Sequence, residues 1–428
     1  MDADSRSYSW ASLKWLNVTQ FLGALNDNVF KLLVIFFLVH ILGEERRAEV
    51  IAMASGIFVL PFLLFSQAAG VLADRISKKQ VILIAKGLEV VVMLLGLAAV
   101  GLRTPLGLYG VIFLMSTQSA LFGPAKYGIV PELVKPENLS RANSLLVGFT
   151  YLAIIIGTFL PTFLLLSVFD GSFYALALFC VVVAAGGLTA ALRISYTPAA
   201  GSEKRFSPWF VLEIGRTLRS ISRDGELLLA VIGAAYFLFL GGFMQQNLLL
   251  YGREILGLSL VRSGYLFPVA AIGIGLGALI TGRLSGRTIG FGVVPIGAAG
   301  LTLGCLALGL VPPRIGAVIG LIFIVGVSAG LYIVPLNAFI QFRSPNRSRG
   351  QVLACTSFLS FSGVALSAAA LVLLTRTCGL SAEENFVVIG VLTGVLAILA
   401  LALCGKAPAN LNFNASGGRA IDSIRRNT

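Results

Sequence analysis

The chain has 428 residues, of which 57% are hydrophobic and only 12% are charged, and its mean hydropathy is +0.92. A soluble domain of average composition carries about twice this share of charge, so a soluble fold would leave large apolar patches in water. The composition therefore predicts a multi-span membrane protein. It excludes a secreted disulfide scaffold, a nucleic-acid-binding domain and most soluble enzymes. One histidine, His40, and five scattered cysteines without a Cys-x-x-Cys spacing argue against a metal site, and no cofactor is expected.

Apolar segments long enough to cross about 30 Å of hydrocarbon recur along the whole chain. Twelve such spans are predicted, at residues 16–41, 50–73, 79–101, 106–131, 143–167, 172–194, 226–252, 262–284, 288–311, 314–340, 351–376 and 384–405. We therefore expect an all-α membrane protein with twelve transmembrane helices in two six-helix halves.

The distribution of charge predicts how the spans are oriented. If both termini lie in the cytoplasm, the cytoplasmic loops and tails hold 22 of the Lys and Arg residues and the opposite side holds 7. Cytoplasmic loops of membrane proteins carry such an excess of Lys and Arg. The net charge of +13 is thus mainly a topology signal, and anionic lipids of the inner leaflet are its natural neighbours.

The longest interior hydrophilic stretch divides the chain. The predicted parts are an N-terminal half (1–194), a cytoplasmic linker (195–225), a C-terminal half (226–405) and a cytoplasmic tail (406–428). The linker favours a helix that lies on the inner membrane surface. Its basic residues share one helical face and its apolar residues the other: Arg216, Arg219 and Arg223, opposite Val211, Ile214, Leu218 and Ile221. A solvated linker with a short helix is equally compatible with this pattern.

An internal repeat supports the division into halves. Pro124-Ala-Lys126 precedes Arg141-Ala-Asn143 in the first half, and Pro335-Leu-Asn337 precedes Arg349-Gly-Gln351 in the second. Each pair brackets the connection between the fourth and fifth span of its half. Duplicated six-helix halves are typical of secondary transporters.

The loop after the second span carries the strongest general motif. It reads Gly70-Val-Leu-Ala-Asp74-Arg75 and continues with a basic pair, which resembles the loop signature of the major facilitator superfamily. Gly70 allows two helices to approach closely. Asp74 can accept hydrogen bonds from the N-terminus of a neighbouring helix or from an arginine. The motif predicts a gate formed by Gly70, Asp74 and Arg75 that holds the cytoplasmic side closed. An ordinary charged loop is the alternative.

The first span carries polar residues on one side. Asp27 and Lys31 are four residues apart, lie on one helical face and could pair, with Asn28 beside them. Charged residues are costly in hydrocarbon, so they are candidates for substrate binding or gating. An ion pair that only fixes helix packing is the alternative.

The fourth span ends in Pro124-Ala-Lys126-Tyr127 and continues to Glu132. Pro124 removes a backbone donor and perturbs the helix. Lys126, close to this break, could bind a phosphate, could pair with Asp27, or could extend to the membrane interface.

Two other spans carry polar groups. Gln245, Gln246 and Asn247 are consecutive in the seventh span, so at least one of them is expected to face a cavity, with hydrogen bonds between helices as the alternative. Lys86 and Glu89 are three apart in the third span and are expected to form an internal pair.

Three strings carry a more specific resemblance. QFLGALNDN in the first span, FGPAKYGIVPEL in the fourth and VPLNA around Asn337 in the tenth resemble the bacterial lysophospholipid transporter family (LplT) of the major facilitator superfamily. The resemblance runs over most of the twelve spans. It implies that the chain flips lysophosphatidylethanolamine-like lipids across the inner membrane. A cytoplasmic acyltransferase/acyl-carrier-protein synthetase, separate or fused, would then reacylate them. The resemblance matches the family's span-one acid to Asp27, its span-four lysine to Lys126 and the acid of its Pro-Glu-Leu string to Glu132.

One position departs from the family pattern. The family's span-seven arginine falls at Gln245 here, so its pairing with the span-one acid is not available, and Lys31 could supply the missing charge. Another class of function also stays open, a proton-coupled facilitator that exports a drug or other small amphiphile with Asp27 as its titrating group. No nucleophile and base are placed as an enzyme would need them.

Overall fold

The computed structural model describes residues 8–204, 206–207, 209–285, 288–289, 292–404 and 411–412. Twelve of the described helices are long and apolar enough to cross a membrane, which confirms the expected fold class. They are α1 (Trp10–Leu42), α2 (Arg47–Arg75), α3 (Lys78–Gly101), α4 (Pro105–Leu133), α5 (Leu139–Ser167), α6 (Phe173–Leu192), α8 (Gly225–Glu254), α10 (Leu266–Leu284), α11 (Val293–Leu310), α12 (Ile315–Arg343), α13 (Arg349–Val372) and α14 (Ala382–Cys404).

Short elements complete the fold. They are α7 (Phe210–Ile221), α9 (Leu260–Gly264), the single turns η2 (Glu44–Arg46) and η3 (Pro136–Asn138), the π-helical turn η4 (Leu373–Thr377), and the antiparallel pair β1 (Thr288–Ile289) and β2 (Leu411–Asn412).

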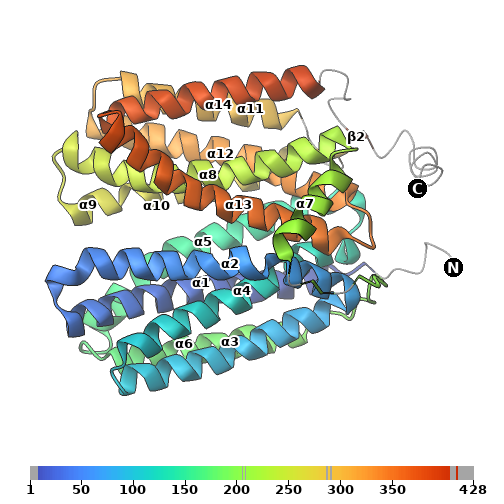
Figure 1. The fold of residues 1–428 in the computed structure, drawn as a ribbon, viewed down its shortest axis with the longest axis horizontal. Helices are drawn as coiled ribbons and strands as arrows, with labels where there is room; N and C mark the ends of the chain where they lie inside the picture. The colour runs from blue at the N-terminus through green and yellow to red at the C-terminus, as the bar shows by residue number, and fades with distance from the viewer. Residues whose placement is uncertain are drawn as a thin grey trace.

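The long helices form two groups that lie one above the other in Figure 1. Helices α1 to α6 pack against one another in one half, and α8 with α10 to α14 pack in the other. The halves meet mainly through α2 against α13 and through α5 against α10. We call the end where α1 begins and α7 lies the linker end, at the right of Figure 1, and the end where α9 lies the far end.

Several helices run past the apolar stretch that identifies them in the sequence. Helix α1 begins at Trp10 rather than at residue 16, because the Ser9 side chain accepts a hydrogen bond from the Ser12 backbone N–H, 3.2 Å away. Asp224 caps α8 in the same way through the Leu227 N–H. A capped end satisfies backbone donors that hydropathy does not register, so the predicted boundaries are too short here.

The linker helix forms, but its apolar side is not arranged as expected. Ile214 and Ile221 are buried, and α7 packs on α2 and α13. Val211, expected on the same face, is 59% exposed, and Arg223 lies beyond the end of the helix. Protein therefore covers the part of the predicted apolar side that holds Ile214 and Ile221, whereas Val211 is exposed.

Candidate functional site

At the linker end, an acid of the N-terminal half forms hydrogen bonds to the C-terminal half. Asp74, in the last turn of α2, accepts hydrogen bonds from the backbone N–H groups of Gly350 (2.7 Å) and Gln351 (3.0 Å) and from the Gln351 side chain (3.3 Å). These N–H groups belong to the first turn of α13, where a helix leaves donors unpaired and favours negative charge. The acid therefore accepts bonds from a helix N-terminus, as the motif indicates, whereas its action as a gate stays a prediction. Arg75 is exposed.

Two glycines allow the halves to approach closely at this end. A Cβ atom on Gly70 would lie 2.5 Å from the Ala354 Cβ of α13, and one on Gly282 would lie 2.1 Å from the Ser144 hydroxyl of α5. Both separations are shorter than real contacts, so a side chain at either glycine would push the helices apart.

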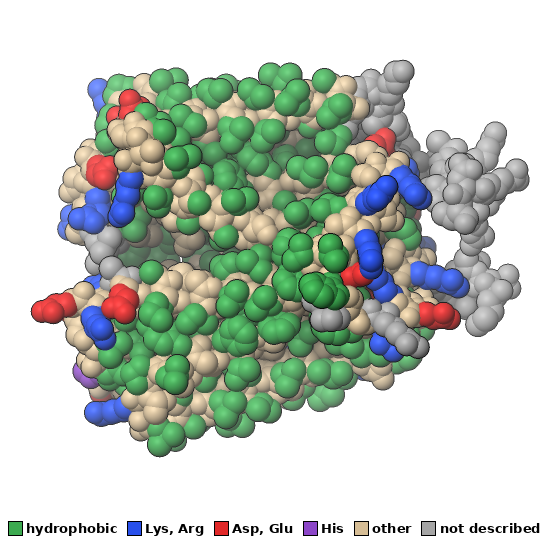
Figure 2. Space-filling view, in the orientation of Figure 1, with side chains coloured by type: hydrophobic (Ala, Val, Ile, Leu, Met, Phe, Trp, Pro, Cys, Tyr) green, Lys and Arg blue, Asp and Glu red, His purple; other side chains and the backbone are tan. Residues whose placement is uncertain are grey.

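A second inter-half contact lies nearby. The side chains of Asn143 on α5 and Gln341 on α12 exchange two hydrogen bonds, at 2.9 and 2.8 Å, and both are buried. A hollow between the halves opens at the far end, at the left of Figure 2. The structure is thus closed at the linker end and hollowed at the far end.

Helices α1, α3 and α4 bring together a polar cluster inside the N-terminal half. Lys86 and Glu89 form an ion pair at 2.5 Å, with at most 2% of either side chain exposed, which confirms the internal pair expected in the third span. Asn26 donates a hydrogen bond to the other oxygen of Glu89, at 3.1 Å. Asp27 accepts a hydrogen bond from Ser119 of α4 at 2.7 Å, and its second oxygen has no partner among the described residues.

Two possible pairings of Asp27 do not form. In the described part of the chain, neither Lys31 nor Lys126 makes an ion pair with it. The ammonium group of Lys31 lies instead over the Phe58 ring, 5.1 Å from the ring centre. Four-residue spacing puts two side chains on one face, but aromatic neighbours on α2 and a hydroxyl on α4 compete for them.

Lys126 is buried among aromatic rings. It is 9% exposed, and its ammonium group lies 4.4 Å from the centre of the Tyr127 ring and 5.6 Å from that of Phe122. Lys86 approaches the same Phe122 ring at 4.7 Å. Within the residues that the structure describes, Lys126 has no ion pair and no hydrogen bond, and it makes cation–π contacts with these aromatic rings. Its burial excludes the prediction that it extends to the membrane interface.

Glu132 and Asn28 have local partners. Glu132, at the end of α4, forms an ion pair with Lys78 of α3 at 2.6 Å. The Asn28 side chain donates to the backbone oxygen of Ala24, one turn earlier in α1. Neither lies unpaired in a cavity in this state.

The amides of the seventh span separate into different environments. Gln245 is exposed, and Gln246 donates to the backbone oxygen of Gly242 in its own helix. Asn247 is buried, donates to the Ala382 backbone oxygen and accepts a hydrogen bond from Asn385, so it ties α8 to α14. The sequence pattern does not single out Asn385 as the partner of Asn247, although an asparagine near the start of an apolar span is a signal of a hydrogen bond between helices.

Asn337, the counterpart of Lys126 in the repeat, is half-buried in α12. Across the described ranges, no three His, Cys, Asp or Glu side chains come together as a metal site would require. The site therefore offers charge, amides and aromatic surface.

Known proteins share this architecture. The model of the Major Facilitator Superfamily matches residues 16–368. The human organic anion transporter MFSD10 superposes with a TM-score of 0.74 at 16% identity, covering 91% of this chain and 99% of that one. A bacterial homologue of the iron transporter ferroportin, in its outward-facing state, gives 0.72 at 17% identity over 92% and 98% of the two chains.

Curated relatives narrow the family. The lysophospholipid transporter LplT of Klebsiella pneumoniae is 30% identical over 76% of this chain and 78% of its own length. The LplT of an Enterobacter species is 29% identical over 90% and 92%. The chain therefore belongs to the Major Facilitator Superfamily of transporters and, within it, to the family of the lysophospholipid transporter LplT.

Proposed function

We propose that the chain moves lysophospholipids of the lysophosphatidylethanolamine type across the bacterial inner membrane by alternating access. The linker end would face the cytoplasm, with both termini there, and the far end would face outwards. Delivered lipids would then be reacylated on the cytoplasmic side by an acyltransferase/acyl-carrier-protein synthetase.

The observation that carries this proposal is the environment of Lys126. A buried cation with aromatic neighbours, and with no ion pair in the described chain, can accept a phosphate without first breaking a salt bridge. Burying a phosphate in a low-dielectric site requires such a positive partner or several donors. A lysolipid presents one phosphate and one acyl chain.

The aromatic side chains of the spans also suit such a substrate. Aromatic rings gather in the spans, and the Phe62 and Phe361 rings stack across the two halves with centres 3.8 Å apart. A sugar or other soluble metabolite would require polar groups distributed over both halves, whereas the charged residues in the middle of the described spans lie in the N-terminal half: Asp27, Lys31, Lys86, Glu89 and Lys126. The LplT relatives point to the same substrate class.

The test is uptake of labelled lysophosphatidylethanolamine by membrane vesicles that hold equal amounts of each variant. We expect Lys126→Ala to reduce uptake by about 10- to 100-fold, the range for a lost hydrogen bond to a charged group, and Lys126→Arg to retain part of it. Lys135→Ala is the matched control, because Lys135 follows the same helix and is exposed.

Lys86→Ala should impair uptake less than Lys126→Ala in correctly folded protein. Because Lys86 neutralises the buried Glu89, the folded fraction of this variant must be measured beside its uptake. Parental uptake by Lys126→Ala would remove Lys126 from the transport route.

The second candidate, a proton-coupled exporter of small amphiphiles, is favoured by the unpartnered carboxylate oxygen of Asp27. Such an exporter would accumulate a cationic dye against its gradient when an imposed pH difference drives it, and lysolipid would neither bind nor compete.

A further inference from the structure

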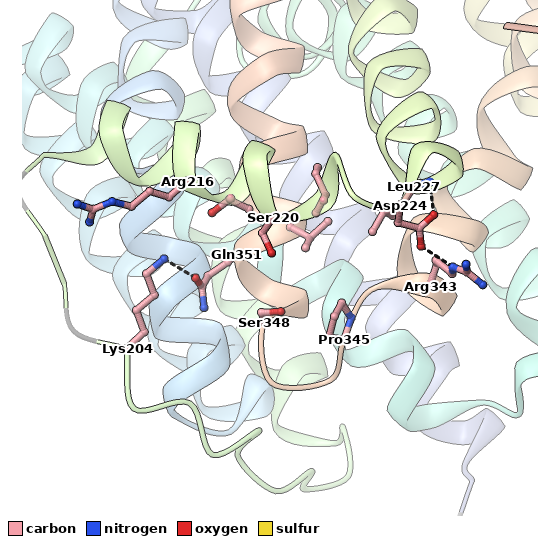
Figure 3. Close-up of a pocket in the computed structure, with 12 residues that line it drawn as sticks. Lys204, Arg216, Ser220, Asp224, Leu227, Arg343, Pro345, Ser348 and Gln351 are labelled. Atoms are coloured by element: carbon pink, nitrogen blue, oxygen red, sulfur yellow. Dashed lines mark hydrogen bonds and ion pairs between the residues drawn. The ribbon is translucent and has the colours of Figure 1, made fainter. Parts of the chain in front are cut away.

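A cavity of about 250 Å³ lies at the linker end, outside the polar cluster of the spans. It is open on one side and is lined by α7, the start of α8, the turn between α12 and α13, the first turn of α13 and Lys204 of the linker. Figure 3 shows the Ser220 and Ser348 side chains on either side of it and the Lys204 ammonium pointing toward Gln351, whereas the guanidinium ends of Arg216 and Arg343 point outward on opposite sides. The two hydroxyls and the Lys204 ammonium are donors that suit a phosphate group, and the two arginines add positive charge at the rim.

The cavity carries an excess of positive charge. Lys204 and Arg216 share one carboxylate, that of Glu213, and the contact between Lys204 and Glu213 measures 2.8 Å. Arg343 pairs with Asp224 at 2.6 Å. The residues that line the cavity thus include three cations, Lys204, Arg216 and Arg343, and one carboxylate, Asp224, which favours an anionic ligand.

The beginning of α7 indicates where that anion comes from. Phe206, Trp209, Val211 and Leu212, which precede the part of α7 that lines the cavity, expose 58–70% of their surface. Figure 2 shows hydrophobic side chains meeting Lys and Arg side chains at this end of the molecule. Exposed Trp and Phe next to basic residues are typical of a helix that lies in the headgroup region of a membrane, and the nearest phosphates there belong to lipids.

The cavity is also connected to the acid that joins the halves. The Lys204 ammonium donates to the Gln351 side-chain oxygen at 2.7 Å, and the Gln351 amide nitrogen donates to Asp74 at 3.3 Å. The backbone N–H of Ser202 donates to the backbone oxygen of Asp74 at 3.3 Å. Separation of the halves would withdraw Asp74 and remove an anchor from the Ser202–Lys204 segment, which supplies one side of the cavity.

We propose that this cavity binds the phosphate of an anionic phospholipid from the leaflet at the linker end, and that the bound lipid holds that end closed. The cavity is complete only while Asp74 holds α13 and the linker, so the lipid binds the closed state more tightly. A ligand shifts a conformational equilibrium by such a difference in affinity. The site is separate from the transport route and acts as a regulator of it.

Lipid retention tests the binding step. The purified protein would be given equal phosphatidylglycerol and phosphatidylcholine, and native mass spectrometry would count the lipids bound. We expect Lys204→Gln/Arg216→Gln to hold less phosphatidylglycerol than Arg219→Gln/Arg223→Gln, by on the order of fivefold. The second pair removes the same charge from the same segment and does not line the cavity. Equal loss in both would reduce the effect to general surface charge and overturn the proposal.

A soluble competitor distinguishes the source of the phosphate. Millimolar inorganic phosphate should leave the bound phosphatidylglycerol in place, because the apolar side chains of α7 hold the lipid as well. Complete displacement by inorganic phosphate would instead assign the cavity to a soluble anion and overturn its assignment to lipid.

Thiol labelling tests the effect on the closed end. Ser140 is buried on the same face of α5 as Asn143 and Ser144, which contact the other half. With Cys378 and Cys404 replaced by Ser, a Ser140→Cys thiol should label more slowly in nanodiscs that contain phosphatidylglycerol than in pure phosphatidylcholine.

This slowing should disappear in Lys204→Gln/Arg216→Gln and persist in Arg219→Gln/Arg223→Gln. Lipid-independent labelling in the parent protein would contradict the proposal. Neither readout measures lysolipid transport, so failure here and failure of the proposed function can be distinguished.

Discussion

Asp27 shows how a charged residue is placed in an apolar bundle. A charged residue at the membrane centre costs about 2.5–3.5 kcal/mol on insertion scales. The Ser119 hydroxyl offsets part of this cost through a hydrogen bond to one carboxylate oxygen, while the other oxygen has no partner among the described residues. The acid is thus positioned but incompletely satisfied, which is what a group that meets a passing headgroup or proton requires.

Asp27→Asn should therefore reduce lysolipid uptake by about tenfold or more, with expression near that of the parent. The amide keeps the shape and can still accept from Ser119, so folding is spared, whereas the charge is lost. Uptake of labelled lysolipid per unit of protein in the membrane checks this. Asp170→Asn, at an exposed turn of the far end, is the matched control. Near-normal uptake by Asp27→Asn would remove the acid from the mechanism.

Substitutions at Asn247 and Gln245 should distinguish a residue that stabilises the fold from a residue that contacts substrate. Asn247→Ala removes hydrogen bonds to Ala382 and Asn385, and polar contacts between membrane helices contribute about 0.6–2 kcal/mol. We expect a lower unfolding temperature in detergent with uptake per folded molecule unchanged. Gln245→Ala, at an exposed site, should leave the unfolding temperature unchanged and lower uptake only if Gln245 contacts substrate. Reduced uptake by fully folded Asn247→Ala would contradict its structural role.

At the scale of elements, the Glu213 carboxylate of α7 pairs with Lys204 and joins the helix to the preceding linker segment. The Lys204 ammonium, which donates a hydrogen bond to Glu213, holds the pKa of that carboxyl below its ordinary value, and the neighbouring Arg216 acts in the same direction. A carboxyl whose pKa is lowered in the folded state contributes stability that is fully present above its unfolded pKa. This contribution is lost as the pH falls through the lower, folded value.

The docking of α7 should therefore be constant from pH 7 to about pH 5 and weaken only below about pH 4, given an ordinary Glu pKa of about 4.3. Acrylamide quenching of a Phe210→Trp variant, with Trp10, Trp15 and Trp209 replaced by Phe, measures this, because the Phe210 ring packs against Phe358 of α13. Glu213→Gln should raise quenching at neutral pH and remove the acid transition. A midpoint above pH 5 in the parent would mean that another group controls the docking.

The internal repeat also acts at this scale. Gly70 and Gly282, which close the second span of each half, lie against α13 and α5 of the opposite half. Asn143 and Gln351, which follow the Arg of each repeated motif, both hydrogen-bond across the interface. The two halves thus use equivalent positions to close the same end, although Gly282 lacks an acid to match Asp74.

For the whole molecule, the balance between closed and open linker ends depends on Asp74. Asp74→Asn replaces an acceptor of three hydrogen bonds by an amide whose NH₂ group faces backbone donors of α13. Loss of charge-assisted bonds worth about 1.5–3 kcal/mol should shift the equilibrium toward the open linker end by roughly tenfold or more.

The rate of labelling of a Ser140→Cys thiol should rise accordingly. Glu203→Gln, an exposed acid at the same end, should leave the rate unchanged. An unchanged rate in Asp74→Asn would leave Asp74 as a charge that directs topology only.

The sequence by itself determined the twelve spans, the contact of Asp74 with a helix N-terminus and the Lys86–Glu89 pair. Backbone groups that cross hydrocarbon must be hydrogen-bonded within the segment, so a spanning segment is a continuous apolar helix. A three-residue spacing places two side chains on one face of a helix. Each of these features depends on neighbours within one segment or on a motif whose geometry recurs.

Only the tertiary structure decided which groups meet across segments. Ser119 lies 92 residues from Asp27 and displaces Lys31 as the partner, and Gln341 lies 198 residues from Asn143. Likewise, helical periodicity revealed an apolar side on α7 but not that α2 and α13 cover it. Periodicity records which side of a helix avoids water, whereas the surface that covers it depends on how the helices pack.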